Sequence, residues 1–173
     1  INAYIERGAA YERRKELDKA LADFDQAIEI DPETAFLYSN RGRVHQARGD
    51  LDQAFADYAT AIRLGEGAEA RVSEGHVRRL QGDLDGAIAC YDAAIQSDPQ
   101  YARAYNNRGA ARAFKGDRYG ALADFSQALL LNPKDVLAYK NRAATYAEMD
   151  NRVAAIADFQ RYLDLGGGQA HGE

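Results

Sequence analysis

The sequence predicts an all-helical protein built from five stacked helix hairpins, and three observations support this. Alanine fills 34 of the 173 positions and proline only 3, which is a helix-forming composition. A nine-residue segment first seen at 19–27 returns at 53–61, 86–94, 120–128 and 154–162. The copies therefore start 34, 33, 34 and 34 residues apart. A fixed period of this length is typical of a stacked-repeat architecture rather than of one globular core.

Each repeat is expected to start with a short helix that buries one stripe of side chains. In the first repeat Tyr4, Gly8 and Tyr11 recur at helical spacing and form this stripe. A break is expected near Lys15, because three later repeats have glycine followed by aspartate at this point. Glycine suits the end of one helix, and aspartate suits the cap of the next.

The second helix of each repeat is expected to bury alanine and aromatic side chains. Ala20, Phe24 and Ala27 lie on one face in the first repeat. The helix should end at Asp31, because the following proline disfavours helical geometry in the residue before it. We place the repeats at 1–34, 35–67, 68–101, 102–135 and 136–169, as a single domain followed by a flexible tail at 170–173.

Two further registers predict how the two helices of a repeat fit together. Glycine recurs in the middle of the first helix, at Gly8, Gly42, Gly75 and Gly109. Glycine in the middle of a helix costs about 1 kcal/mol relative to alanine. Because this cost recurs at the same register in four repeats, we expect that the second helix approaches too closely there for a larger side chain. An arginine and an aspartate also recur in four repeats, as Arg7 with Asp23, Arg41 with Asp57, Arg108 with Asp124, and Arg142 with Asp158. Repeat three lacks both and has Glu74 and Cys90, so we expect these residues to pair within each repeat.

The combined pattern resembles the tetratricopeptide repeat. It covers residues 1–169 in five copies, and the Asn-Arg-Gly triplets at 40–42 and 107–109 are most similar to bacterial members. The resemblance implies a right-handed α-solenoid of about ten antiparallel helices, with the first helix of each repeat lining a concave groove. It also implies a non-enzymatic adaptor or scaffold that binds a peptide segment of a partner protein in this groove.

The resemblance assigns particular side chains of the first helices to the groove. The candidate peptide-binding residues are Asn40, Arg43, Val72, His76, Arg79, Leu80, Arg103, Asn106, Asn107, Phe114 and Lys140. The same registers include Ala110, Ala113, Ala144 and Glu148. At the groove registers of the three central repeats, Arg43, Arg79, Arg103 and His76 stand against a single acidic residue, Glu69, which favours an acidic partner. Asn40 and Asn107 would read a peptide backbone, and Val72, Leu80 and Phe114 would be apolar anchors. The alternative is that these arginines are ordinary solvated surface.

Other classes of function fit the sequence less well. The three histidines are far apart and Cys90 has no histidine at a suitable spacing, so no catalytic, metal or cofactor site is expected. The net charge of −5 argues against nucleic acid as the partner, and an RNA-binding helical repeat ranks below peptide binding. Apolar runs are too short for membrane insertion. A chain that begins at Ile1 is expected to be processed or cut from a longer one. The cytoplasm is the favoured compartment, with the periplasm as the alternative if a signal segment was removed.

Self-assembly through the ends is the runner-up function. A stacked-repeat protein exposes at each end the face that another repeat would cover. Tyr162 stands where the other repeats have alanine, and we expect it to pack over the end of repeat five or at a contact between two copies.

Overall fold

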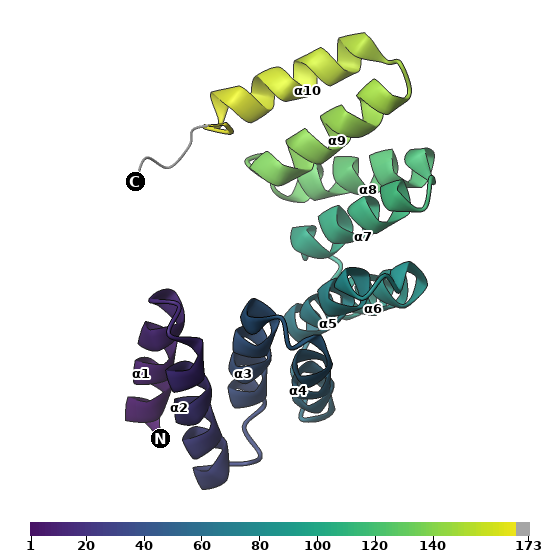
Figure 1. Ribbon diagram of the computed structural model, residues 1–173. Coiled ribbons are helices and arrows are strands. Elements are labelled where there is room, and N and C mark those ends of the chain that lie inside the picture. Colours follow the sequence, from purple (N-terminus) through teal and green to yellow (C-terminus); the bar gives the residue numbers. More distant parts are fainter. Residues whose placement is uncertain (169–173) are drawn as a thin grey trace. The chain divides into compact units, whose positions relative to one another are not determined.

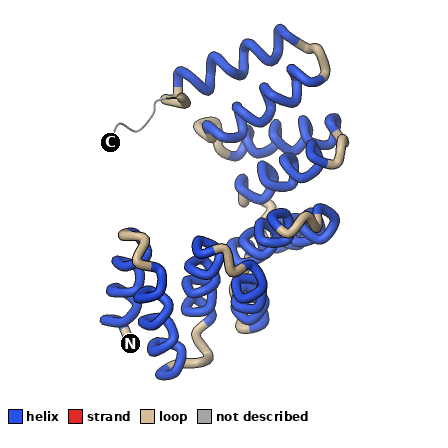
Figure 2. The backbone as a smooth tube through the Cα atoms, in the orientation of Figure 1, coloured by secondary structure: helices blue, strands red, loops and turns tan. Residues whose placement is uncertain are grey.

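The computed structural model describes residues 1–168, which form helices joined by short turns (Figures 1 and 2). The helices are α1 (Asn2–Arg13), α2 (Leu17–Ile30), α3 (Ala35–Arg48), α4 (Leu51–Arg63), α5 (Ala68–Leu80), α6 (Leu84–Ser97), α7 (Ala102–Phe114), α8 (Arg118–Leu131), α9 (Val136–Glu148) and α10 (Arg152–Asp164). The all-helical repeat fold is therefore confirmed, with two helices in each repeat. The predicted tail at 170–173 lies outside the described residues. Within residues 1–168, no helix combines the length and the apolar character that a membrane crossing needs.

The chain divides into two compact units, the first ending at Cys90 and the second beginning at Tyr91, so the division falls within α6. In the first unit, α1 and α2 form a hairpin, α3 packs on α2, and α3 and α4 form the next hairpin, on which α5 packs. In the second unit, α7 and α8 form a hairpin, α9 packs on α8, and α9 pairs with α10.

The turns inside the repeats have the predicted chemistry. Gly49 and Gly116 end the first helices of their repeats in the left-handed conformation, with φ of 91° and 86°. The aspartate that follows Gly116 caps the next helix: Asp117 accepts a hydrogen bond from the backbone N–H of Gly120 at 2.9 Å. The equivalent Asp50 makes no such bond and accepts from Arg48 instead. Lys15 and Asp150 take the same turn at φ of 59° and 56°, although side chains disfavour this conformation. The turn geometry is thus set by the repeat and not by glycine alone.

The glycines of the first helices lie where the predicted close approach occurs. A Cβ atom at Gly8 would lie 3.2 Å from the ring of Phe24, and one at Gly42 would lie 3.2 Å from the ring of Tyr58. At Gly109 the distance to the Phe125 ring would be only 2.8 Å. The aromatic ring of the second helix therefore occupies the space that a larger residue would need.

Replacing Gly109 with alanine should destabilise the protein by about 1–2 kcal/mol, even though alanine is the better helix former. The added methyl group would force the buried Phe125 ring out of place. Urea unfolding followed by circular dichroism measures this. Gly8→Ala is the comparison, and it should cost less because its nearest contact is longer; an equal or larger loss there would contradict the packing argument.

The expected arginine–aspartate pairs are present in all four repeats that contain both residues. The Nη2 atom of each arginine lies within hydrogen-bond distance of the carboxylate of its own repeat: 2.7 Å for Arg7–Asp23, 2.7 Å for Arg41–Asp57, 2.6 Å for Arg108–Asp124 and 2.8 Å for Arg142–Asp158. Each Nε also donates to the same carboxylate, so the contacts are bidentate. The aspartates are buried, which makes these pairs more important than exposed ones.

The same arginines also connect neighbouring repeats. Three of them use Nη1 to reach the second helix of the repeat before: Arg41 donates to Asp25, Arg108 to Asp92, and Arg142 to Ser126. In repeat three, Glu74 accepts a hydrogen bond from Arg78, which also donates to Asp83. In three repeats, the same arginine therefore links the two helices of its own repeat and also contacts the preceding repeat.

Candidate functional site

The candidate residues lie on the first helices of the repeats, which neighbour one another within each unit. In the first unit α3 lies beside both α1 and α5, and in the second unit α7 lies beside α9.

In the first unit, one of the two arginines that were expected to meet a partner is already paired within the protein. Arg43 of α3 donates from Nε and Nη2 to the two carboxylate oxygens of Glu12 on α1, both at 2.6 Å. The hydrogen bond with Glu12 raises the pKa of Arg43 above its usual value. Arg43 therefore presents a neutralised ion pair and not a free cation, which weakens the sequence-based argument for an acidic partner at this point.

The structure also corrects two other expectations in the first unit. Asn40 is buried: its Nδ2 donates to the carbonyl oxygen of Phe36 at 2.7 Å, and its Oδ1 accepts from Arg43 at 2.9 Å. Asn40 is thus engaged inside the protein and not positioned to read a partner's backbone. Val72 is completely buried and is not an exposed anchor.

The remaining candidates of the first unit reach the surface to different degrees. The Nδ1 atom of His76 lies 3.2 Å from Nε2 of Gln46, a contact between neighbouring repeats. Arg79 is half-buried, and Leu80 is exposed near the end of α5. This face is largely a network of contacts that the protein makes with itself.

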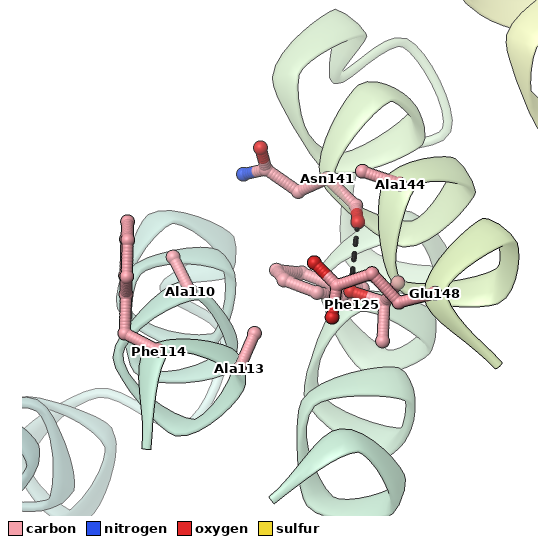
Figure 3. Close-up of a pocket in the computed structure, with 8 residues that line it drawn as sticks. Ala110, Ala113, Phe114, Phe125, Asn141, Ala144 and Glu148 are labelled. Carbon is pink, nitrogen blue, oxygen red and sulfur yellow. Dashed lines mark hydrogen bonds between the residues drawn. The ribbon is translucent and has the colours of Figure 1, made fainter. Parts of the chain in front are cut away.

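The second unit has a pocket between α7 and α9 (Figure 3). Its volume is about 190 Å³. Ala110, Ala113 and Phe114 of α7 lie opposite Asn141, Ala144 and Glu148 of α9 across it, with Phe125 of α8 between them. Thr145 of α9 also lines the pocket. The alanine side chains create the hollow because they are too short to meet across it. The pocket is smaller than sites for drug-sized ligands, and it suits one apolar side chain.

The rim of the pocket combines an aromatic side chain with polar groups. Phe114 is 71% exposed, an unusual position for a large apolar ring. Glu148 accepts a hydrogen bond from Nε of Arg118 at 3.1 Å, so its charge is partly balanced. Asn141 donates to Asn106 at 3.1 Å across the two repeats. The pocket thus offers an apolar interior with an amide and a carboxylate at its edge.

The other predicted residues of the second unit have different surroundings. Asn106 is buried and accepts the hydrogen bond from Asn141, so it supports the pocket and does not face a partner. Asn107 is half-buried. Arg103 and Lys140 are exposed near the beginnings of α7 and α9.

Sequence reasoning missed two of the pocket residues. Phe125 was expected only as core, yet its ring also lines the pocket from α8. Thr145 occupies a register that other repeats fill with alanine or valine, and its hydroxyl donates to the carbonyl oxygen of Asn141 at 2.9 Å. A polar residue at a register that is otherwise apolar was the available signal.

Cys90 lies on α6 in the first unit and is a half-buried thiol. Burial raises its pKa to about 11. Because only the thiolate reacts, we expect Cys90 to react with a disulfide reagent about 100-fold more slowly at pH 8 than an ordinary cysteine. The reaction rate of the folded protein should keep rising through pH 10. The urea-unfolded chain is the control, and its Cys90 should react at the rate of an ordinary cysteine. A rate that levels off near pH 9 in the folded protein would contradict the raised pKa.

The described residues contain no group of three or more histidine, cysteine, aspartate or glutamate side chains placed to hold a metal ion.

Comparison with known proteins places this geometry in context. Three models of the tetratricopeptide repeat match the chain, over residues 1–34, 75–116 and 102–135. No curated protein matches in a sequence search. Among solved structures, PilF of Pseudomonas aeruginosa has a TM-score of 0.88 at 24% identity, with 98% of this chain and 77% of that chain covered.

Two further solved structures have similar folds. A MamA protein matches with a TM-score of 0.76 at 20% identity, covering 95% of this chain and 90% of that one. YrrB, described as a TPR protein with an unusual peptide-binding site, matches with a TM-score of 0.69 at 25% identity, covering 94% and 84%.

Proposed function

The chain belongs to the tetratricopeptide repeat family, and from that premise we propose that it is a protein-interaction scaffold that binds a segment of a partner protein at the pocket of repeats four and five. The observation that carries the proposal is the pocket itself. It has an apolar interior, it is open to solvent, and an exposed phenylalanine stands at its rim. Exposed aromatic side chains beside a pocket are typical of sites that bind other proteins.

The lining of the pocket defines the chemistry of the segment. Ala110, Ala113 and Ala144 leave room for one large apolar side chain, and Phe114 would stack against it. The segment would lie along α7 and α9, and we expect its backbone to contact Asn141, which lines the pocket, and Asn107, one turn before Ala110 on α7. Toward the beginnings of these helices, Arg103 and Lys140 favour an acidic residue. The proposed ligand is therefore a short peptide with a leucine, methionine or phenylalanine and a nearby acidic residue.

YrrB supports the choice of ligand class, since it has a similar fold and is described as having a peptide-binding site. The pocket is small and its carboxylate is already paired with Arg118, which favours an apolar side chain as its occupant.

A selection from a random peptide library displayed on phage tests the proposal. The chain is immobilised, and binding peptides are sequenced and then measured by fluorescence anisotropy. We expect enrichment of peptides with one large apolar residue and an acidic neighbour. Failure to enrich any common motif, or enrichment of purely basic sequences, would contradict the proposed ligand.

A further inference from the structure

Glu148 lies at one end of the pocket between α7 and α9, and one of its carboxylate oxygens is free. The side chain lines the pocket and extends from α9 toward α7 (Figure 3). Its Oε2 accepts the hydrogen bond from Nε of Arg118, whereas Oε1 accepts none from the described residues. Glu12 differs in this respect, because Arg43 donates to both of its oxygens. Glu148 therefore keeps an acceptor available at the rim of the pocket.

Phe114 stands opposite Glu148 at the same end of the pocket. The two residues are the last of α7 and α9, and the hydrogen bond from Asn141 to Asn106 holds these helices in matching register. Both side chains are more than half exposed. An aromatic ring and a carboxylate on two sides of a hollow suit a lysine or arginine side chain. Its methylene groups can pack on the ring while its cation meets the carboxylate.

The other end of the pocket attracts the opposite charge. Lys140 lies one turn before Ala144 on α9, and Arg103 is the second residue of α7. Both cationic side chains are exposed. The helix dipoles act in the same sense, because N-terminal ends carry partial positive charge and C-terminal ends carry partial negative charge. The pocket therefore has a positive end and a negative end, with the hollow formed by the alanines between them.

The spacing of these groups matches an extended peptide. Lys140, Ala144 and Glu148 follow one another at intervals of four residues, which is about 6 Å along a helix. In an extended peptide every second side chain lies on the same face, about 6.6 Å from the previous one. We infer that the ligand has an acidic, a large apolar and a basic residue at alternate positions, and that Glu148 recognises the basic one. This inference rests on the proposed function, because it adds the basic residue and the spacing to the same site.

Two cations at this end of the pocket limit how much the contact with Glu148 can contribute. Arg118 is bonded to Oε2, so a ligand cation can bind Oε1 while this bond remains. Lys115 follows the last residue of α7 and adds a positive charge. The Glu148 side chain is also 55% exposed. Contacts between exposed charges are weak, so we expect the basic residue to raise the affinity only about threefold to fivefold.

Parallel selections from the random peptide library test the inference, with the enriched sequences aligned on their apolar residue. For the original chain, we expect lysine or arginine two positions to one side of this residue and aspartate or glutamate two positions to the other. Glu148→Lys should replace the basic preference with an acidic one, and Lys140→Glu should remove the acidic preference on the opposite side. Glu33→Lys is the control, because it changes the net charge as Glu148→Lys does but lies exposed outside the pocket. It should keep the original motif.

A double-mutant cycle then measures the contact with one selected peptide that carries both charges. Glu148→Gln should weaken this peptide about threefold to fivefold in fluorescence anisotropy, because glutamine keeps the size of the side chain and removes its charge. A peptide with alanine in place of the basic residue should change by less than about 1.5-fold. The Glu148 side chain is exposed, so circular dichroism should show an unchanged fold.

The outcomes separate this inference from the function on which it rests. Peptides that share an apolar residue and fail to bind an Ala144→Trp chain, yet show no basic preference or keep it with Glu148→Lys, would overturn the inference and leave the proposed function standing. A basic residue enriched at a spacing other than two positions would overturn the extended arrangement. If no motif with an apolar residue is enriched, the proposed function fails and the inference fails with it.

Discussion

Replacing Ala144 with tryptophan should abolish binding of the selected peptides, with an affinity loss of at least about 30-fold. Ala144 is exposed on α9 and lines the pocket opposite Ala110 and Ala113. An indole at this position would occupy the space reserved for the peptide's apolar side chain. Losing one well-buried anchor of this kind typically costs about 2 kcal/mol or more. Fluorescence anisotropy with a labelled peptide measures the change.

The matched control is Ala123→Trp, the same substitution at an exposed alanine of α8 outside the pocket. It should leave the peptide affinity within about twofold of the original. Both variants should unfold at similar urea concentrations, because neither replaced side chain is buried. Equal losses of affinity in the two variants would show that the peptide does not use the pocket.

Replacing Asp124 with alanine should destabilise the protein by about 3 kcal/mol. Asp124 accepts hydrogen bonds from Nε and Nη2 of Arg108 at 2.9 and 2.6 Å, and from Nη1 of Arg112 at 2.8 Å. Its side chain is only 4% exposed. Removing it would leave two guanidinium groups in a poorly solvated site without their shared carboxylate, which is the costly way to break a buried ion pair. The midpoint of urea unfolding, followed by circular dichroism, reports the loss.

Asp92→Ala provides the comparison, since Asp92 accepts from the same Arg108 but its side chain is 51% exposed. Water can replace this contact, so the expected loss is below about 1 kcal/mol. If both substitutions cost the same, burial of the carboxylate would not be what makes the intra-repeat pair important.

Most of the fold could be predicted because the same residue types recur at equivalent positions in several repeats. One mid-helix glycine is weak evidence, but Gly8, Gly42 and Gly109 at the same register indicate a close approach, and each lies beside an aromatic ring. The pairing of Arg108 with Asp124 followed from the joint loss of both residue types in repeat three. Contacts between residues far apart in the sequence could therefore be predicted from residue types that recur, or are lost together, across the repeats.

The candidate site could be predicted only in part, because which registers face solvent depends on the neighbouring repeat. The sequence predicted that Arg43 is available to a partner, but Glu12, 31 residues earlier, lies within reach and pairs with it. Val72 shares its register with Lys140, yet the short apolar side chain is buried while the long charged one extends to water. The alanines that line the pocket were all among the registers that the sequence analysis assigned to the groove. Their ability to form a hollow depends on helix spacing, which the sequence does not specify.

The most direct test of the central claim is to observe the pocket while a selected peptide binds. The chain is labelled with ¹³C at its alanine methyl groups, and spectra are recorded during titration with the peptide. We expect the largest shifts at Ala110, Ala113 and Ala144, with little change at the exposed Ala123 on α8. Shifts confined to alanines of the second helices, with these three methyl groups unmoved, would contradict binding at the pocket.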